Sequence, residues 1–314
     1  MKDETLPSTK LYNDYNTYLK NRYGEKVYRI GLDAGFTCPN RDGTRGRGGC
    51  IYCAGDGSRS SYTDPKNSVT EQLRSRIEYL KEKKGAAKFI AYFQAFTNTY
   101  APVAVLKRAY DQVLPFKDVV GLSIGTRPDA VDKEKMELIA SYKKWYDVWV
   151  EYGLQSVNDR TLAAIKRGHS FGDFLNALNL AKKAGVKVAV HVILGLPGET
   201  REDMINTART LNKMRINGIK IHLLHVLKGS VLEKLHRRRK VRLLEQAEYA
   251  DLVCDFLEHL SSDIIIQRLT GEGTRESHIA PAWALDKLGT LAKIRETMEK
   301  RGSCQGAKSA SRPG

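Results

Sequence analysis

Apolar residues along this chain follow two different periods in turn. Six short apolar runs have the length of buried strands: 27–32, 89–96, 119–124, 148–153, 186–194 and 219–224. Longer segments with apolar residues at helical spacing lie between them: 69–84, 102–113, 133–144, 159–166 with 171–184, and 201–214. Strands that alternate with helices favour an α/β protein whose parallel strands are joined by right-handed crossovers.

Cap residues mark the starts of several predicted helices. Ser68 and Ser170 precede amphipathic segments, and Thr200 to Asp203 has the form of a capping box in which aspartate replaces the usual glutamate or glutamine. Three further elements follow the last strand–helix pair. The pattern predicts a helix at 243–260, a strand at 263–267 and a last helix at 282–301.

The composition suits a folded protein with a substantial core. Hydrophobic residues make up 41% of the 314 positions, so disulfide bonds are not needed for stability. No apolar run approaches the roughly 18 residues of a membrane span, and the first residues are polar with no apolar signal core. We therefore expect a soluble, cytoplasmic protein.

The charge of the chain is strongly positive. Lysine and arginine total 52 against 36 aspartate and glutamate, which gives a net charge of +16. An excess of this size favours a polyanionic partner, with RNA as the leading candidate. A basic surface that only keeps the protein in solution is the alternative. The run from Arg237 to Lys240 is either part of an RNA-binding surface or a solvated loop beside a helix.

Three of the five cysteines, Cys38, Cys50 and Cys53, lie close together in a glycine-rich loop that follows the first predicted strand. Three thiols cannot all pair in disulfides, and nothing in the sequence indicates secretion. A structural zinc site would need a distant fourth ligand such as His169. A cubic iron–sulfur cluster held by three cysteines keeps one iron open for another ligand, which suits this incomplete set.

The cysteine loop resembles the cluster loop of radical S-adenosylmethionine (radical SAM) enzymes, with the aromatic Tyr52 directly before the last cysteine. The long gap after the first cysteine is similar to the branch that contains the catalytic subunit of Elongator, and most of all to a bacterial subfamily of short radical SAM proteins. Residues 35–43, 222–229 and 279–283 also resemble that subfamily. The resemblance implies a [4Fe–4S] cluster on the three cysteines and S-adenosylmethionine (SAM) as the second cofactor.

The same resemblance implies a partial, laterally open TIM-like barrel of six βα units with a C-terminal strand and helix extension. An open sheet covered on both faces is the alternative, and in either fold the site lies at the carboxyl ends of the strands. We expect a flexible N-terminus at 1–11 and the radical SAM partial barrel at 12–230. An extension packed on the barrel should follow at 231–301, and a disordered basic tail at 302–314.

Polar residues after the second and third strands are candidates for SAM binding. Radical SAM enzymes usually carry a carboxylate after the second strand that receives the methionine amino group, and this chain has the polar residues Gln94, Thr97 and Asn98 there instead. After the third strand, the resemblance implies that Ser123 or Thr126 bonds a ribose hydroxyl. A polar turn without a ligand is the alternative after the second strand.

Arg127 follows in the same turn and would pair with the methionine carboxylate of SAM or with a substrate anion. A salt bridge from Arg127 to a neighbouring carboxylate is the structural alternative.

The fourth and fifth strands end in further candidates. Glu151 is either a polar ligand for the adenosyl group or substrate, or the buried partner of a cation in the barrel. Gln155 lies in a Gly-x-Gln-Ser pattern that resembles a SAM contact. The resemblance also places His191 at a polar SAM contact, the backbone near Ile193 at the adenine edge, and Tyr52 near the cluster and adenine. A satisfied core histidine is the alternative for His191.

The reaction that the resemblance implies is reductive cleavage of SAM to methionine and a 5′-deoxyadenosyl radical, with the electron from a donor such as flavodoxin or ferredoxin. The likeness to Elongator favours tRNA as partner, with modification of a carboxymethylaminomethyl-type group at C5 of the wobble uridine. Two rival hypotheses remain: a radical SAM enzyme acting on a small molecule or peptide, and a non-catalytic zinc protein that binds nucleic acid.

Overall fold

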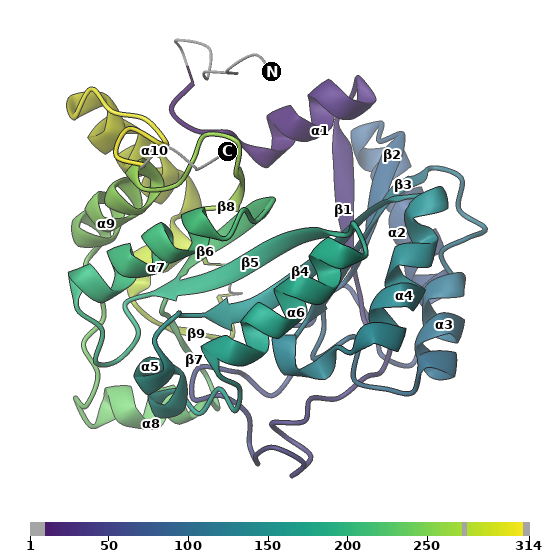
Figure 1. Ribbon diagram of the computed structural model, residues 1–314, viewed down its shortest axis with the longest axis horizontal. Coiled ribbons are helices and arrows are strands. Elements are labelled where there is room, and N and C mark those ends of the chain that lie inside the picture. The colour runs from purple at the N-terminus through teal and green to yellow at the C-terminus, as the bar shows by residue number, and fades with distance from the viewer. Residues whose placement is uncertain (1–9, 272–274, 310–314) are drawn as a thin grey trace.

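Seven parallel strands curl into a partial barrel in the computed structural model, which describes residues 10–271 and 275–309 (Figure 1). The strands lie in the order β1-β2-β3-β4-β5-β6-β8. Their bounds are Val27–Leu32, Lys88–Phe93, Val119–Thr126, Asp147–Gln155, Lys187–Leu194, Gly218–Leu223 and Ile265–Arg268. The predicted α/β class and partial barrel are confirmed. The strand predicted in the C-terminal extension joins the barrel itself, since β8 pairs in parallel with β6.

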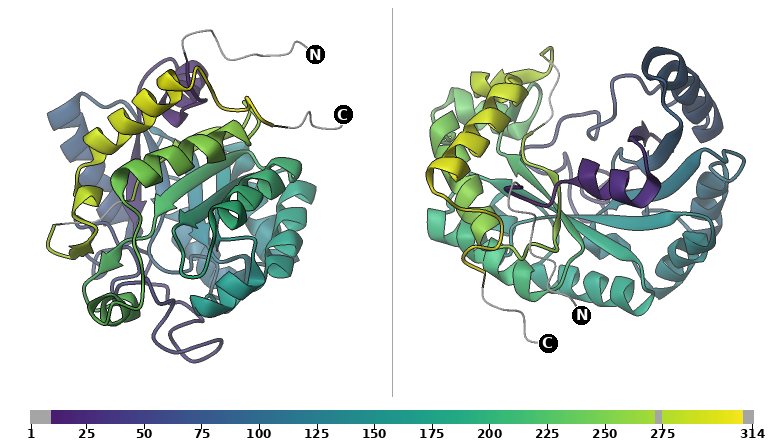
Figure 2. Two further views of the ribbon diagram at one scale, coloured as in Figure 1. Left: turned by 90° about the vertical axis from the view of Figure 1, so that its left-hand side faces the viewer. Right: turned by 90° about the horizontal axis from the view of Figure 1, so that it is seen from above.

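The predicted helices cover the outer face of the curled sheet (Figure 2). Their bounds are Val69–Lys84 (α2), Val103–Asp111 (α3), Lys133–Ser141 (α4), Asp159–Ala164 (α5), Phe171–Lys183 (α6), Arg201–Lys213 (α7), Gln246–Glu258 (α9) and Lys287–Lys300 (α10). Short 3₁₀ turns occur at Pro128–Ala130, Tyr142–Lys144 and Ala282–Leu285. The side chains of Ser68, Ser170 and Thr200 each cap a helix within a complete capping box, and Asp203 closes the third box as predicted.

Helix α1 (Tyr15–Tyr23), which the sequence pattern did not predict, lies across the amino ends of the strands. Tyr15 and Leu19 pack against an apolar layer inside the barrel that includes Val27 and Trp149. Figure 1 places α1 at the end of the barrel opposite the long loop between β1 and α2. The amino end of the barrel is therefore covered, and its mouth lies at the carboxyl ends of the strands.

A second small sheet lies at the mouth of the barrel. It consists of β7 (Val226–Leu227) and β9 (His278–Ala280), which pair in antiparallel fashion. Helix α8 (Val231–Arg237) follows β7 in the chain. The backbone N–H of Leu232 donates to the carbonyl of Ile51 at 2.7 Å, which ties α8 to the cysteine loop. In Figure 1 these elements and the loop lie at the same end of the molecule.

The tail after α10 packs on the body of the protein, so the disorder predicted for it is wrong for residues 302–309. The buried side chain of Gln305 donates through Nε2 to the carbonyls of Ser261 and Ile264, and its backbone N–H donates to the carbonyl of Leu11. The polar composition of the tail predicts disorder, but backbone carbonyls just before β8 give Gln305 a binding site. Residues 310–314, and residues 1–9 of the predicted flexible N-terminus, lie outside the described part.

Across residues 10–271 and 275–309, none of the helices has the length and apolar character that a membrane crossing requires.

Candidate active site at the mouth of the barrel

The cysteine loop is fastened to the mouth of the barrel by backbone hydrogen bonds. The N–H of Ile51 donates to the carbonyl of Ile165, and the N–H of Thr97 donates to the carbonyl of Thr37. Within the loop, the N–H of Cys53 donates to the carbonyl of Cys50 at 3.0 Å. The loop is therefore held at both of its cysteine-bearing ends, by the loop after β2 and by the end of α5.

Cys50 is buried and surrounded by donors. Arg167 Nη1 and Asn40 Nδ2 each approach its Sγ to 3.4 Å. Burial acts to raise the pKa of Cys50, but the Arg167 guanidinium together with Tyr52 and Arg127 outweighs it, so the pKa lies below its ordinary value. Gly153 makes room for this contact, because a Cβ on it would meet the Arg167 guanidinium at 2.8 Å. The site thus favours a thiolate at position 50.

Cys53 has a different environment. Arg41 Nη2 donates to its Sγ at 3.3 Å. Burial nevertheless raises the pKa of Cys53, and Cys50 and Cys38 add to the rise by charge repulsion. The three sulfur atoms are therefore near enough to influence one another electrostatically.

The donor set fits an iron–sulfur cluster better than a closed zinc site. Within the described residues, no three His, Cys, Asp or Glu side chains gather so that they could hold a single metal ion. His169, the candidate fourth zinc ligand, is engaged with the carbonyls of Gly153 and Ser170. The thiolates of a four-iron cluster bind separate irons and need not converge on one point. Three cysteines, one of them favoured as a thiolate, match that requirement.

The predicted SAM-binding loops lie beside the cysteine loop, and several of their polar atoms lack a protein partner. Thr97 Oγ1, Asn98 Oδ1 and Ser123 Oγ are buried without a hydrogen bond among the described residues. Gln94 Nε2 donates to the carbonyl of Ser58 at 2.8 Å. Buried polar atoms are normally satisfied, so these three fit a site that awaits a polar ligand.

Two other residues of these loops already have partners. Thr126 Oγ1 and Thr99 Oγ1 share a hydrogen bond of 2.6 Å. Arg127 Nε and Nη2 donate to both carboxylate oxygens of Asp129, and its Nη1 donates to the carbonyl of Arg167. The structure therefore has the salt bridge that was the alternative for Arg127, and its pairing with the SAM carboxylate or a substrate anion stays a prediction.

Residues from the ends of β4 and β5 complete the mouth. Gln155 has a φ of 79° at the bulge where β4 ends, a left-handed conformation uncommon outside glycine. Ile193 packs with Ile51 in an apolar cluster against which Tyr52 also lies. Burial raises the pKa of Tyr52 well above its ordinary value, and the Cys50 thiol beside it adds to that rise. The contacts of these three residues with SAM stay predictions.

Glu151 and His191 lie deeper in the barrel. His191 Nε2 is 2.9 Å from Glu151 Oε2, and Arg29 Nη2 is 3.1 Å from Glu151 Oε1. Lys220 Nζ forms a close ion pair with the same carboxylate. Of the two roles predicted for Glu151, the structure shows that of a buried partner of barrel cations.

Comparison with known proteins shows the family of the chain. Residues 40–211 match the family described as the radical SAM superfamily, and residues 216–300 match the radical SAM C-terminal domain. The chain belongs to the radical SAM superfamily. Enzymes of this superfamily use a [4Fe–4S] cluster and SAM, which agrees with the cysteine loop.

Two relatives of this radical SAM protein match along nearly the whole chain. The uncharacterized protein YtqA of Bacillus subtilis is 41% identical over 297 residues, which cover 95% of this chain and 92% of YtqA. The protein YhcC of Escherichia coli K12 is 35% identical over 297 residues, which cover 93% of this chain and 94% of YhcC. The predicted likeness to a subfamily of short radical SAM proteins is confirmed.

More distant similarity connects the chain to the Elongator branch. A tRNA uridine(34) acetyltransferase of Methanocaldococcus infernus is 29% identical over 137 residues, which cover 43% of this chain and 25% of that protein. The solved structure of Elp3 from the same archaeon, which lacks residues 1–46, matches with a TM-score of 0.68 and 20% identity. That match covers 89% of this chain and 64% of the Elp3 chain, so this radical SAM protein spans just under two thirds of that structure and shares its fold.

Three residues around the sulfur atoms were not singled out from the sequence. Arg167 is far from the cysteines in sequence, and only the fold brings it to Cys50. Asn40 and Arg41 lie inside the cysteine motif, where a polar and a basic residue next to the first cysteine are the signals that could have identified them.

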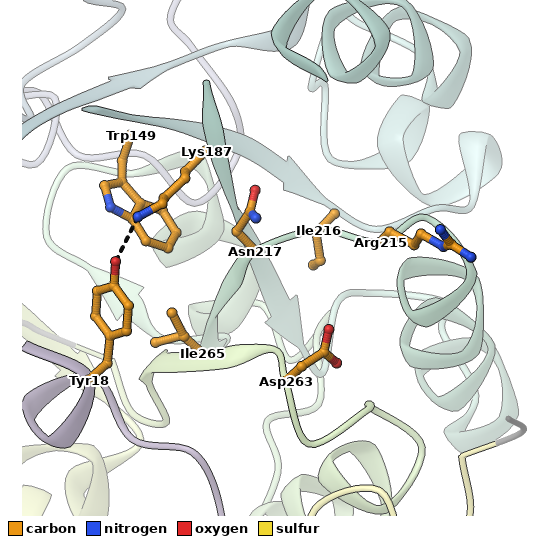
Figure 3. Close-up of a pocket in the computed structure, with 8 residues that line it drawn as sticks. All are labelled: Tyr18, Trp149, Lys187, Arg215, Ile216, Asn217, Asp263 and Ile265. Carbon is orange, nitrogen blue, oxygen red and sulfur yellow. Dashed lines mark hydrogen bonds between the residues drawn. The ribbon is translucent and has the colours of Figure 1, made fainter. Parts of the chain in front are cut away.

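A pocket of about 580 Å³ lies at the opposite end of the radical SAM barrel (Figure 3). Its lining comes from the amino ends of strands and from α1, and includes Tyr18, Trp149 and Lys187, whose Nζ donates to the Tyr18 hydroxyl at 2.8 Å. Because active sites of barrels form at the carboxyl ends of strands, this pocket is not the candidate active site.

Proposed function

We propose that this radical SAM enzyme modifies the C5 side chain of the wobble uridine of tRNA, with a carboxymethylaminomethyl-type group as its target. The observation that carries the proposal is the sequence similarity to a tRNA uridine(34) acetyltransferase. Because the match covers only 25% of that enzyme, we do not extend acetyl transfer to this chain.

A basic surface beside the mouth supports RNA as the partner. Residues 237–240, at the end of α8 and just after it, are exposed and carry four positive charges. The hydrogen bond between Leu232 and Ile51 places α8 next to the cysteine loop, where Arg45 and Arg47 are exposed as well. Phosphate groups of an anticodon stem would be attracted to this surface while a base enters the mouth.

The chain's own residues have defined tasks in this proposal. Cys38, Cys50 and Cys53 would hold the cluster, and Arg167 would keep Cys50 in its thiolate form. When bound, the cluster and SAM supply a 5′-deoxyadenosyl radical that abstracts a substrate hydrogen. Ser123 would orient SAM or the substrate through its unpartnered hydroxyl. An electron donor such as flavodoxin or ferredoxin would reduce the cluster.

Nucleoside analysis of tRNA from cells that lack the gene tests the proposal. We expect a wobble-uridine C5 modification to be lost or arrested at a precursor, and to return with the wild-type gene but not with Cys50→Ser. An unchanged modification profile would overturn the proposal. Retention of tRNA on the purified protein should weaken steeply with salt, whereas an enzyme for a small molecule or peptide would not retain tRNA.

A further inference from the structure

Side chains inside the barrel form successive layers, because alternate residues of each strand face the lumen. The deepest layer is apolar and consists of residues from five strands: Val27, Ile90, Trp149, Ala189 and Ile265. Two residues further along the same strands, every lumen position is polar: Arg29, Tyr92, Glu151, His191 and Gln267. On β6, Lys220 joins this second layer through its ion pair with Glu151. We call this set of six residues the polar layer.

The polar layer is built around a single carboxylate. Glu151 pairs with Arg29 at 3.1 Å, with His191 at 2.9 Å and with Lys220. Tyr92 lies between the two cations, since its ring centroid is 4.6 Å from the Arg29 guanidinium carbon and 4.3 Å from Lys220 Nζ. Lys220 Nζ also lies 3.3 Å from the Tyr92 hydroxyl. The side chains therefore form one connected network.

The charges in this network do not balance. Arg29 and Lys220 both pair with Glu151, so two cations share one carboxylate. Lys220 is only 1% exposed, and an uncompensated cation in such a place is costly. Burial, with repulsion from Arg29, lowers the pKa of Lys220 well below its ordinary value. A second negative charge in the layer would relieve this repulsion.

Other observations indicate that a ligand can reach the layer. The side chains of Arg29 and His191 keep 20% and 19% of their surface exposed although they lie inside the barrel. Gln267 Nε2 and the hydroxyl of Ser123 lack partners among the described residues. The next lumen positions on β1 and β4 are Gly31 and Gly153, so the layer lies roughly 7 Å below the mouth, two residues of a strand.

We propose that the polar layer binds the carboxylate of the side chain that the enzyme modifies, with Lys220 and Arg29 as its cationic partners. Phosphate offers the same charge, but a phosphate of the RNA backbone cannot descend into the lumen, whereas a flexible group on C5 of a base can. The identity of the side chain rests on the proposed function. The anion site rests on the lumen contacts alone.

Calorimetric titration of the purified protein with three small probes tests the site. N-Methylglycine carries the amine and carboxylate of a carboxymethylamino group, dimethylamine lacks the carboxylate, and inorganic phosphate represents the other anion. We expect saturable binding of N-methylglycine, none of dimethylamine, and at least tenfold weaker binding of N-methylglycine by Lys220→Met. Lys187→Met removes a lysine at the amino end of β5, which the apolar layer separates from the polar layer, and should bind as the wild type does.

Two further variants keep the test decisive if Lys220→Met does not fold. Lys220→Arg retains the charge and should retain binding. Glu151→Gln removes the competing carboxylate, so it should bind N-methylglycine several-fold more tightly. Equal binding by the wild type and Lys220→Met, absence of any anion binding, or preference for phosphate would each overturn the proposal. These titrations contain no tRNA, so failure of the proposed tRNA substrate would appear separately in the nucleoside profile.

Discussion

The guanidinium of Arg167 contacts the sulfur of Cys50 at 3.4 Å, although 117 positions separate the two residues in sequence. The same guanidinium donates to the carbonyl of Gly153 through Nε and Nη2. One buried cation therefore joins the end of β4 to the cysteine loop.

Arg167→Met should lower the iron and sulfide content of protein reconstituted without oxygen, because Cys50 loses the donor that stabilises its thiolate. Arg167→Lys keeps the charge without the planar fork and should retain an intermediate amount. Metal analysis and sulfide assay measure the effect. Arg160→Met, an exposed arginine on α5, is the control. Full iron content in Arg167→Met would contradict this role.

The three loop cysteines should each be required for cluster binding. Serine at position 38, 50 or 53 removes one ligand, so we expect at least a severalfold loss of iron and a colourless or pale protein. Cys304→Ser changes an exposed cysteine outside the loop and should leave the iron content unchanged. Zinc in place of iron in the anaerobically purified wild type would refute the assignment of these ligands.

Glu199 should make stability depend on pH. Burial raises its pKa to about 7 from an ordinary value of 4.5, while a hydrogen bond from Ser156 opposes the rise. Between these two values the folded state holds a proton that the unfolded state has released, so the free energy of unfolding falls as pH rises from about 4.5 to 7. Glu199→Gln should remove this fall, which is on the order of 2–3 kcal/mol.

Urea unfolding at pH 5 and pH 8 measures the difference. The free energy of unfolding of Glu199→Gln minus that of the wild type should be larger at pH 8 than at pH 5. Glu202→Gln, an exposed neighbour on α7, should show no such gain. A parallel pH dependence in the wild type and Glu199→Gln would show that Glu199 does not titrate in this range.

Gln305 should contribute measurably to stability. Its side chain bonds two backbone carbonyls and accepts from the N–H of Asn13, so Gln305→Ala would take this partner from three backbone groups, of which the Ile264 carbonyl makes a buried hydrogen bond. Such groups cost about 1–3 kcal/mol each, and we expect a net destabilisation of about 2 kcal/mol in denaturant unfolding. Cys304→Ser, at the exposed neighbouring position, should be neutral. A neutral Gln305→Ala would show that the tail is not held in solution.

The basic run after α8 should bind RNA. Changing Arg237, Arg238 and Arg239 together to Ser should weaken tRNA binding. The number of phosphate contacts given by the salt dependence of binding should fall by up to three. SAM cleavage without tRNA should stay the same, because these side chains are exposed outside the barrel. Lys81, Lys83 and Lys84, exposed on α2, provide a matched triple substitution for comparison. Equal losses in both triples would indicate a diffuse charge effect.

Local sequence was sufficient for the seven barrel strands, most helices and the cysteine loop, but not for the short strands β7 and β9. Short apolar runs and amphipathic segments arise because each strand or helix buries particular faces. That pattern can be read from a short stretch of neighbouring residues. Caps such as Ser68 act over three residues and were predictable for the same reason. Helix α1 was missed because only Tyr15 and Leu19 of it are buried, too few for a periodic pattern. The tail was misjudged because its anchor is a polar side chain.

By itself, the sequence determined the α/β class, the partial barrel through its resemblance, and the three cysteines of one loop. Only the tertiary structure decided that Arg167 contacts Cys50, that Arg127 is paired with Asp129, and that Glu151 is shared by two cations. The physical reason is that periodicity and motifs record neighbours along the chain. The charge balance of a barrel lumen depends on side chains from several strands, which meet only when the sheet curls.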